Sequence, residues 1–258
     1  FMKGIERLIF IGTKPPVSFF AYPNRPSVLS PEGAEIMRLA DERVNAEDTL
    51  RRLADKLNAP DQPMHLQASE KLPIVEDGPL DQISLGIIAA QLIPENAIVS
   101  DEGVSSGGQV YRYSAGAPKH DWMTITGGAI GQGLPLATGA AIACPDRKVI
   151  ALQADGSAMY TVQALWTMAR ENLDVTVIIL KNNSYGILNI ELNRVGVAAP
   201  GPKALSLLDL SNPIIDWVAM SHSMGVPAQS ASTTQEFRAA LSAAVAHNGP
   251  RLVEAVLA

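Results

Sequence analysis

The 258-residue sequence has little of several features that mark specialised classes of protein. Its single cysteine, Cys144, excludes an intramolecular disulfide framework and a cysteine-based zinc site. No uninterrupted apolar run approaches the ~18 residues of a membrane-spanning helix, and the first residues lack the apolar core of a signal peptide. No block of lysine and arginine marks a surface for nucleic acid or an anionic membrane. We therefore expect a soluble, cytoplasmic protein.

The residues that are present describe a globular chain. Hydrophobic residues make up 47% and charged residues 18%, and the net charge is −6. Aromatic residues are few, at 5%, and small or short aliphatic residues favour close packing of helices on a sheet. The length suits one large α/β domain, or one domain with part of another.

Residues 80–258 alternate between short apolar runs and helical patterns. The β-branched run Val175–Leu180 is typical of a strand that is buried on both faces, and Lys148–Gln153 and Arg251–Leu257 resemble it. Such alternation predicts right-handed β-α-β crossovers. The expected fold class is α/β, with a parallel sheet covered by helices on both faces.

Residues 1–60 are less regular. One strand is predicted at Ile5–Gly12, and two helices are predicted near 31–39 and 46–57. A lone strand has no sheet partner, so we interpret this segment as the end of a larger domain. Residues 61–79 are rich in proline and polar residues without sustained periodicity, which is typical of a linker.

Two neighbouring strands of the predicted sheet end in polar residues. Asp155-Gly156-Ser157 follows one strand, and Asn182 follows the next strand, 27 residues after Asp155. Ligands of open parallel sheets bind beyond the carboxyl ends of the strands, and carboxylate and amide oxygens suit Mg²⁺. Taken alone, Asp155 or Ser157 could equally cap a helix, and Asn182 could belong to a turn.

A glycine-rich segment precedes these strand ends. Four glycines lie between Gly127 and Gly133, and Pro135 follows. This pattern predicts close backbone approach to a ligand and then a helix, although helix packing alone could explain Gly131 and Gly133. Ile130, within the segment, could be an ordinary core residue.

Together, the Asp155-Gly156-Ser157 motif, the spacing to Asn182 and the run Gly128–Pro135 resemble the thiamine diphosphate (ThDP) enzymes. The similarity is greatest to the acetolactate synthase and benzoylformate decarboxylase branch. It covers residues 75–258 as the diphosphate-binding domain, and residues 1–60 resemble the end of the central Rossmann-like domain. The resemblance implies ThDP and Mg²⁺ as cofactors.

The resemblance also implies a role for each matching residue. The side chains of Asp155 and Asn182 and the backbone carbonyl of Ser184 would bind Mg²⁺. Ile130 would be the bulky aliphatic residue that bends the cofactor, and the carbonyl of Gly128 would accept from its 4′-amino group. Cofactor contacts near the diphosphate are implied for Val104, Ser105, Gly156, Ser157, Tyr185 and Gly186.

Two positions depart from the family pattern. Ala154 stands where a glycine usually precedes the aspartate, and we expect it to be tolerated if its φ is negative. Lys181 stands where an asparagine often precedes the ligand asparagine, and we expect its side chain to point away from the metal.

The activity implied by the resemblance is that of a 2-oxo acid decarboxylase or carboligase, with acetolactate synthase-like carboligation as the first choice. The family activates ThDP with a glutamate on a separate pyrimidine-binding domain, usually from a partner subunit, and nothing in this chain resembles that domain. We therefore expect a fragment or one subunit of a split enzyme, inactive alone and part of a homo-oligomer in its active form. The sequence does not identify the 2-oxo acid.

Two other functions stay open. One is a simple decarboxylase similar to benzoylformate decarboxylase, and the other is a ThDP-binding or interaction module without turnover. An ordinary nucleotide-binding α/β domain is disfavoured, because no G-x-G-x-x-G or Walker pattern follows any predicted strand.

Overall fold

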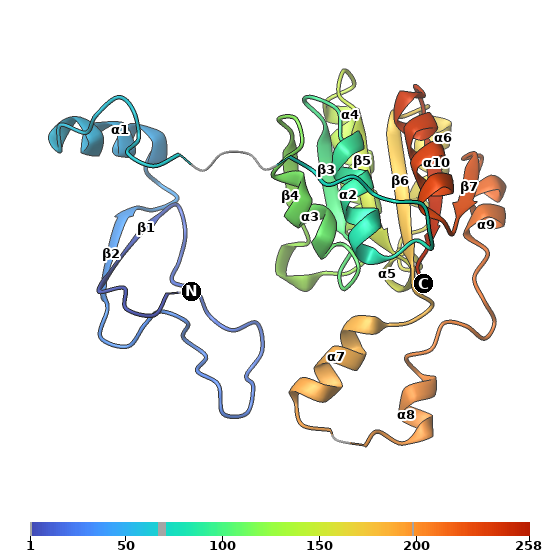
Figure 1. The fold of residues 1–258 in the computed structure, drawn as a ribbon, viewed down its shortest axis with the longest axis horizontal. Coiled ribbons are helices and arrows are strands. Elements are labelled where there is room, and N and C mark those ends of the chain that lie inside the picture. The colour runs from blue at the N-terminus through green and yellow to red at the C-terminus, as the bar shows by residue number, and fades with distance from the viewer. Residues whose placement is uncertain (1, 67–70, 198) are drawn as a thin grey trace. The chain divides into compact units, whose positions relative to one another are not determined.

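The computed structural model describes residues 2–66, 71–197 and 199–258 (Figure 1). The chain divides into two compact units. Residues 1–68 and 192–198 form the first unit, and residues 69–191 and 199–258 form the second.

The first unit contains a two-stranded parallel sheet of β1 (Arg7–Ile11) and β2 (Glu35–Ala40), followed by α1 (Ala46–Lys56). The predicted helix near 31–39 is therefore wrong, and so is the expectation that β1 lacks a partner. The sequence of β2 carries no strong strand pattern. Pairing with β1 decides its conformation, and Gly33, with φ of +80°, turns the chain just before it.

The second unit is built on a six-stranded parallel sheet in the order β4-β3-β5-β6-β8-β7. The predicted inner strands are confirmed, whereas the two edge strands, β4 and β7, were not predicted. The strands are β3 (Ile98–Glu102), β4 (Asp121–Thr124), β5 (Val149–Ala154), β6 (Val175–Lys181), β7 (Ala228–Ala231) and β8 (Arg251–Val256).

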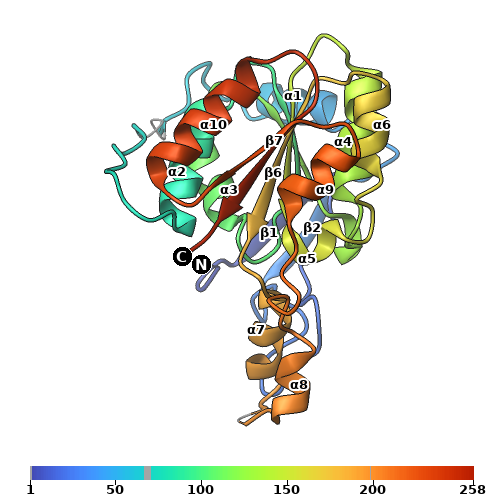
Figure 2. The ribbon, with the colours of Figure 1, turned by 90° about the vertical axis from the view of Figure 1, so that its right-hand side faces the viewer.

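Helices cover both faces of this sheet (Figure 2). One face packs against α2 (Gln82–Leu92), α3 (Gly108–Ser114) and α10 (Thr234–Ala246). The other packs against α4 (Gly133–Ala143), α6 (Ala164–Arg170) and α9 (Trp217–Ser223). The predicted fold class is confirmed.

The central strand β6 shows how the sequence specifies these two cores. All seven of its residues are buried, and successive side chains point to opposite faces. Ile178 and Leu180 pack in the cluster that contains Phe237, whereas Val177 and Ile179 pack in the cluster that contains Trp217. A continuous apolar run is what a strand covered on both faces requires.

The helical pattern after β5 predicts one helix from about 158 to 171, but the structure has two helices there. The short α5 (Asp155–Ala158) follows β5 directly, and α6 begins only at Ala164. The same pattern predicts Trp166 and Met168 as core residues. Met168 is fully buried, which confirms the prediction, whereas Trp166 is 53% exposed and the prediction for it is wrong. The break after α5 changes the face that α6 presents, and the ring of Trp166 lies against the guanidinium of Arg170 instead.

Residues 71–79 form no helix or strand, apart from an isolated bridge between Pro79 and Thr233. Residues 67–70 of the predicted linker lie outside the described residues, and the linker stays a prediction. Within the described part of the chain, no helix combines the length and apolarity needed to cross a membrane.

Candidate functional site

The ends of β5 and β6 bring Asp155 and Asn182 together. The two strands are paired up to Ala154 and Leu180, so the residues that follow the two strands leave the sheet side by side. Oδ2 of Asp155 accepts the backbone N–H groups of Asn182 at 3.1 Å and Asn183 at 2.7 Å. Asp155 therefore does more than cap a helix, and the juxtaposition predicted from the spacing is confirmed.

The electrostatics of this position suit a cation. Asp155 is only 3% exposed, and burial raises the pKa of its carboxyl group, an effect that the backbone N–H groups of Asn183, Gly156 and Asn182 partly offset. A carboxylate has about four lone-pair sites, of which three accept these N–H groups, so capacity for a metal ion remains. A bound cation would offset the desolvation of the charge.

The other atoms near Asp155 that could bind a metal ion are also oxygens. Oδ1 of Asn182 accepts the backbone N–H of Ser184 at 2.9 Å and keeps a second lone pair, and Ser184 adds a backbone carbonyl. Carboxylate, amide and carbonyl oxygens are ligands that Mg²⁺ accepts, usually together with phosphate and water. Among the residues that the structure describes, no group of three or more His, Cys, Asp and Glu side chains could hold a metal. The mixed set at Asp155 fits a Mg²⁺ ion shared with a phosphorylated ligand.

A segment after α8 (Pro202–Ser206) fixes the loop that follows β6. The backbone N–H of Tyr185 donates to the carbonyl of Leu208, and the N–H of Leu210 donates to the carbonyl of Asn183, both at 2.9 Å. The hydroxyl of Ser184 also donates to the Leu208 carbonyl, at 3.1 Å. No local sequence pattern indicated this support, which orders the loop after β6 before α7 (Gly186–Arg194) begins.

Gly156 is required by a close approach. A Cβ atom at this position would lie 2.5 Å from Cε1 of Tyr185, so the Tyr185 ring packs directly on the backbone of the Asp155-Gly156-Ser157 turn. Ser157, the other predicted diphosphate contact, is buried and receives a hydrogen bond from Nε2 of Gln153 at 2.8 Å. The structure thus places Gly156, Ser157 and Tyr185 around one turn.

The end of β3 approaches the same loop. Val104 has φ of +47° and is 36% exposed, and Ser105 lies next to Gly186, where an added Cβ would be 3.1 Å from its hydroxyl oxygen. Nδ2 of Asn182 donates to Oγ of Ser106 at 3.3 Å. Ser106 lies in the segment 101–106, which the resemblance matches to the cofactor, but no local pattern indicates its bond to Asn182, because the contact joins residues 76 positions apart.

The glycine-rich segment forms the 3₁₀ turn η1 (Thr126–Gly128) and a tight loop before α4. The backbone N–H of Ile130 donates to the carbonyl of Gly128 at 3.0 Å, and the hydroxyl of Thr161 donates to the carbonyl of Gly131 at 2.9 Å. The second contact joins this loop to the turn after α5. Ile130 is 42% exposed, so the core alternative is excluded and a bulky aliphatic side chain stands free on the loop.

Both departures from the family pattern are accommodated. Ala154 has φ of −69°, so its methyl group causes no backbone strain, as predicted. Nζ of Lys181 donates to Oε1 of Glu254 at 2.7 Å and to the carbonyl of Ile215 at 2.9 Å. The side chain of Lys181 is therefore directed into the structure and not at Asp155, as predicted.

The buried carboxyl group of Asp101, near the end of β3, leads us to expect that stability depends on pH. Its carboxylate accepts the backbone N–H of Gly103 at 2.9 Å and the indole N–H of Trp122 at 3.3 Å. Burial nevertheless raises the pKa of Asp101, to which the nearby charge of Glu102 adds. A raised pKa in the folded state means that the stabilising contribution of Asp101 is complete below its unfolded pKa and is lost as the pH rises through the folded value.

We expect the free energy of unfolding of the wild type, minus that of Asp101→Asn, to fall as the pH rises above about 4, the ordinary pKa of an aspartate in an unfolded chain. Urea unfolding at a series of pH values measures this difference. A difference that is constant or rises with pH would contradict the raised pKa.

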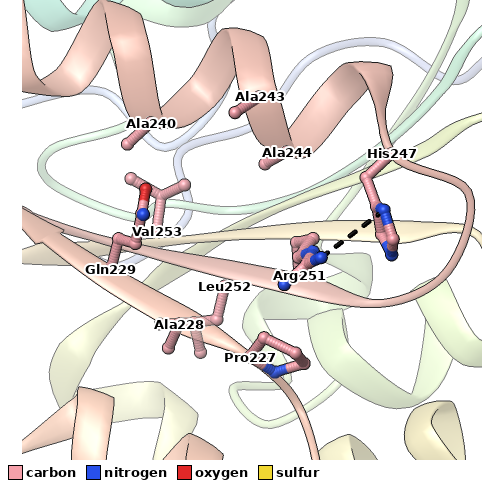
Figure 3. A pocket seen from close by; sticks show the side chains of 10 residues that line it. All are labelled: Pro227, Ala228, Gln229, Ala240, Ala243, Ala244, His247, Arg251, Leu252 and Val253. Carbon is pink, nitrogen blue, oxygen red and sulfur yellow. Dashed lines mark hydrogen bonds between the residues drawn. The ribbon is translucent and has the colours of Figure 1, made fainter.

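A surface pocket of about 380 Å³ lies elsewhere, at the beginnings of β7 and β8 and against α10 (Figure 3). Alanine side chains of α10 form one wall, and Arg251 and His247 lie at one side, 3.5 Å apart. The pocket lies at the amino ends of the parallel strands, whereas Asp155 and Asn182 lie at their carboxyl ends. It is distinct from the candidate site.

Comparison with known proteins agrees with this geometry. The sequence model of the family "Thiamine pyrophosphate enzyme, C-terminal TPP binding domain" matches residues 104–255. A Mycobacterium tuberculosis protein named "Putative acetolactate synthase large subunit IlvX" is 49% identical over 257 residues, which are 99% of this chain and 49% of that protein. Benzoylformate decarboxylase of Pseudomonas aeruginosa is 34% identical over 180 residues, 69% of this chain and 33% of that enzyme.

A solved structure has a similar fold. The thiamine diphosphate-dependent 4-hydroxybenzoylformate decarboxylase of Rhodococcus jostii RHA1 superposes with a TM-score of 0.79 and 26% identity, over 99% of this chain and 49% of that one. The chain spans about half the length of this enzyme and of the mycobacterial relative.

Proposed function

Since the chain belongs to the thiamine pyrophosphate enzymes, we propose that it is the cofactor-binding half of a ThDP- and Mg²⁺-dependent 2-oxo acid decarboxylase or carboligase, similar to acetolactate synthase. The observation that carries the proposal is the buried carboxylate of Asp155, which accepts backbone N–H groups of the Asn182 loop where two neighbouring strands end. The mycobacterial relative, matched along 99% of this chain, supports the acetolactate synthase-like choice.

In this proposal, the end of the sheet holds the charged part of the cofactor. Asp155 and Asn182 bind Mg²⁺ through their side chains and Ser184 through its carbonyl. The diphosphate lies against Gly156 and Ser157. The remaining contacts come from the end of β3 and the start of α7, namely Val104, Ser105, Tyr185 and Gly186.

The glycine-rich loop holds the other end of the cofactor. The carbonyl of Gly128 accepts one internal N–H, from Ile130, and keeps a lone pair for the 4′-amino group. The exposed side chain of Ile130 supports the bent shape. When bound, ThDP supplies the nucleophilic carbanion and the electron sink for loss of CO₂ from a 2-oxo acid. The chain's own residues place the cofactor and shield it from water.

We place the activating glutamate on a pyrimidine-binding domain outside residues 1–258, contributed by more of the same polypeptide or by a partner subunit. We expect the complete site to form in a homo-oligomer. Without that domain, we expect the chain to bind the metal and the diphosphate, and we assign none of the residues that the structure describes to the proton transfer that activates the cofactor.

Two alternative functions stay open, of which the first has specific support. A simple decarboxylase is favoured by the similarity to benzoylformate decarboxylase of P. aeruginosa and to the R. jostii structure. A ThDP-binding module without turnover is favoured if no partner supplies the glutamate.

The products of the reaction distinguish these functions. We expect the protein at its native length, with any subunit that copurifies, to convert pyruvate with ThDP and Mg²⁺ into acetolactate and CO₂, measured by chromatography and CO₂ release. An aldehyde as the sole product would establish the decarboxylase alternative. Saturable cofactor binding without turnover of pyruvate or benzoylformate would establish the binding module, and absence of cofactor binding would overturn all three.

A further inference from the structure

A buried glutamate anchors the glycine-rich loop. Glu102, the last residue of β3, is only 1% exposed. Its Oε1 accepts the backbone N–H of Gly131 at 2.6 Å, and its Oε2 accepts the backbone N–H of Gly133. Gly133 is the first residue of α4, so the carboxylate lies where the helix dipole favours negative charge. The two N–H groups are thereby engaged within the protein and are not available to a ligand.

The contact between Glu102 and Gly133 leaves no room for a larger residue. A Cβ atom at Gly133 would lie 2.8 Å from Cβ and 3.0 Å from Oε2 of Glu102, so only glycine allows the carboxylate to reach the loop. Gln153, which is directly opposite Glu102 in the neighbouring strand, also approaches Gly133 and donates to Ser157. One buried polar cluster thus joins the glycine-rich loop to the turn at Asp155-Gly156-Ser157.

Ile130 depends on this cluster for its position. Its own N–H is bonded to the carbonyl of Gly128, and the next N–H, that of Gly131, is bonded to Glu102. The carbonyl of Gly131 accepts from Thr161. The backbone on both sides of Ile130 is therefore fixed, although the side chain itself is 42% exposed. An exposed isoleucine whose neighbouring backbone groups are hydrogen-bonded is suited to contact a ligand in a defined place.

We infer that Glu102 is a positioning residue, whose buried carboxylate holds residues 128–133 so that Gly128 and Ile130 meet the pyrimidine part of the cofactor. The inference rests on the proposed function. It gives the ends of β5 and β3 different roles. The residues around Asp155, after β5, bind the metal and the diphosphate, whereas Glu102, at the end of β3, orders the loop that contacts the rest of the cofactor.

An amide cannot replace this carboxylate. Glutamine offers one acceptor oxygen where Glu102 offers two, and its NH₂ group would face one of the two glycine N–H groups. Glu102→Gln therefore releases one side of the loop with little change in volume. A purely structural role would lower the affinity for every ligand of the site equally, whereas a positioning role affects only ligands that reach the loop.

The test compares two ligands that share the diphosphate. The protein at its native length is titrated calorimetrically with ThDP and with inorganic diphosphate, both in Mg²⁺. We expect Glu102→Gln to weaken ThDP binding at least ~10-fold, in line with the effect of removing a supporting hydrogen-bond partner, and to change diphosphate binding by less than ~2-fold. Equal losses for both ligands, or no loss for either, would overturn the inference.

Thr176→Val is the matched control. It removes a buried hydrogen bond to the carbonyl of Ala244 near the amino end of β6, far along the strand from the candidate site. We expect it to lower stability and to leave the affinities for ThDP and for diphosphate unchanged. If wild-type protein fails to bind ThDP, the proposed function is wrong, which is a different result from failure of the variant comparison.

Hydrogen exchange of the wild type tests the anchor even if Glu102→Gln does not fold. Without cofactor, we expect the amides of Gly131 and Gly133 to exchange slowly, because both are bonded to a buried carboxylate. Exchange as fast as that of exposed loops would overturn the inference.

Discussion

Replacing Asp155 with alanine lowers the affinity of the native-length protein for ThDP in Mg²⁺ by about 100-fold or more. Groups that merely support a metal ligand already contribute about 10–100-fold, and Asp155 is itself the only carboxylate in the proposed ligand set. The change also leaves the backbone N–H groups of Asn182 and Asn183 without their acceptor, which loosens the loop that carries the other two ligands. Calorimetric titration with ThDP measures the loss.

Asp146→Ala is the matched control for charge. Asp146 is an exposed acid in the turn before β5, so its removal changes the net charge equally and leaves the site intact. We expect unchanged ThDP affinity. Retention of normal, Mg²⁺-dependent affinity by Asp155→Ala would refute the metal assignment, whatever the control shows.

The second large effect concerns stability. Lys181→Met lowers the free energy of unfolding by about 3–5 kcal/mol, because it leaves the carboxylate of Glu254 buried without its partner. The two side chains are 8% and 7% exposed, and Lys181 also donates to the carbonyl of Ile215. Urea unfolding followed by tryptophan fluorescence measures the loss, since all three tryptophans lie in the second unit.

Two further variants separate burial from charge. Lys181→Met combined with Glu254→Met removes both charges, and we expect it to recover most of the stability that the single variant loses. Arg170→Met breaks an exposed pair with Glu171 and costs less than about 1 kcal/mol. A loss for Lys181→Met as small as that for Arg170→Met would show that the buried pair does not have the expected role.

The architecture of the second unit could be predicted because its signals are local and redundant. Apolar runs such as Val175–Leu180 need cover on both faces, and strands that follow each other in the sequence commonly pair, with their carboxyl ends at the same end of a parallel sheet. The convergence of Asp155 and Asn182 follows from these two rules alone. Recognition of the family then required the Asp155-Gly156-Ser157 motif, its spacing to Asn182 and the glycine-rich run Gly128–Pro135.

The failures have equally physical causes. The segment Glu35–Ala40 becomes a strand through pairing with β1, a contact that no local pattern contains. Trp166 lies outside the core because the helix is interrupted between α5 and α6. Glu102 and Ser106 act through hydrogen bonds to residues 29 and 76 positions away, so their roles appear only once the strands are assembled.

A crystal structure of the native-length protein with ThDP and Mg²⁺ tests the account most directly. We predict one octahedral Mg²⁺ ion bound by the carboxylate of Asp155, the amide oxygen of Asn182 and the backbone carbonyl of Ser184, each at about 2.0–2.1 Å, with diphosphate oxygens and water completing the shell. A cofactor bound elsewhere, or a metal ion held by other residues, would contradict it.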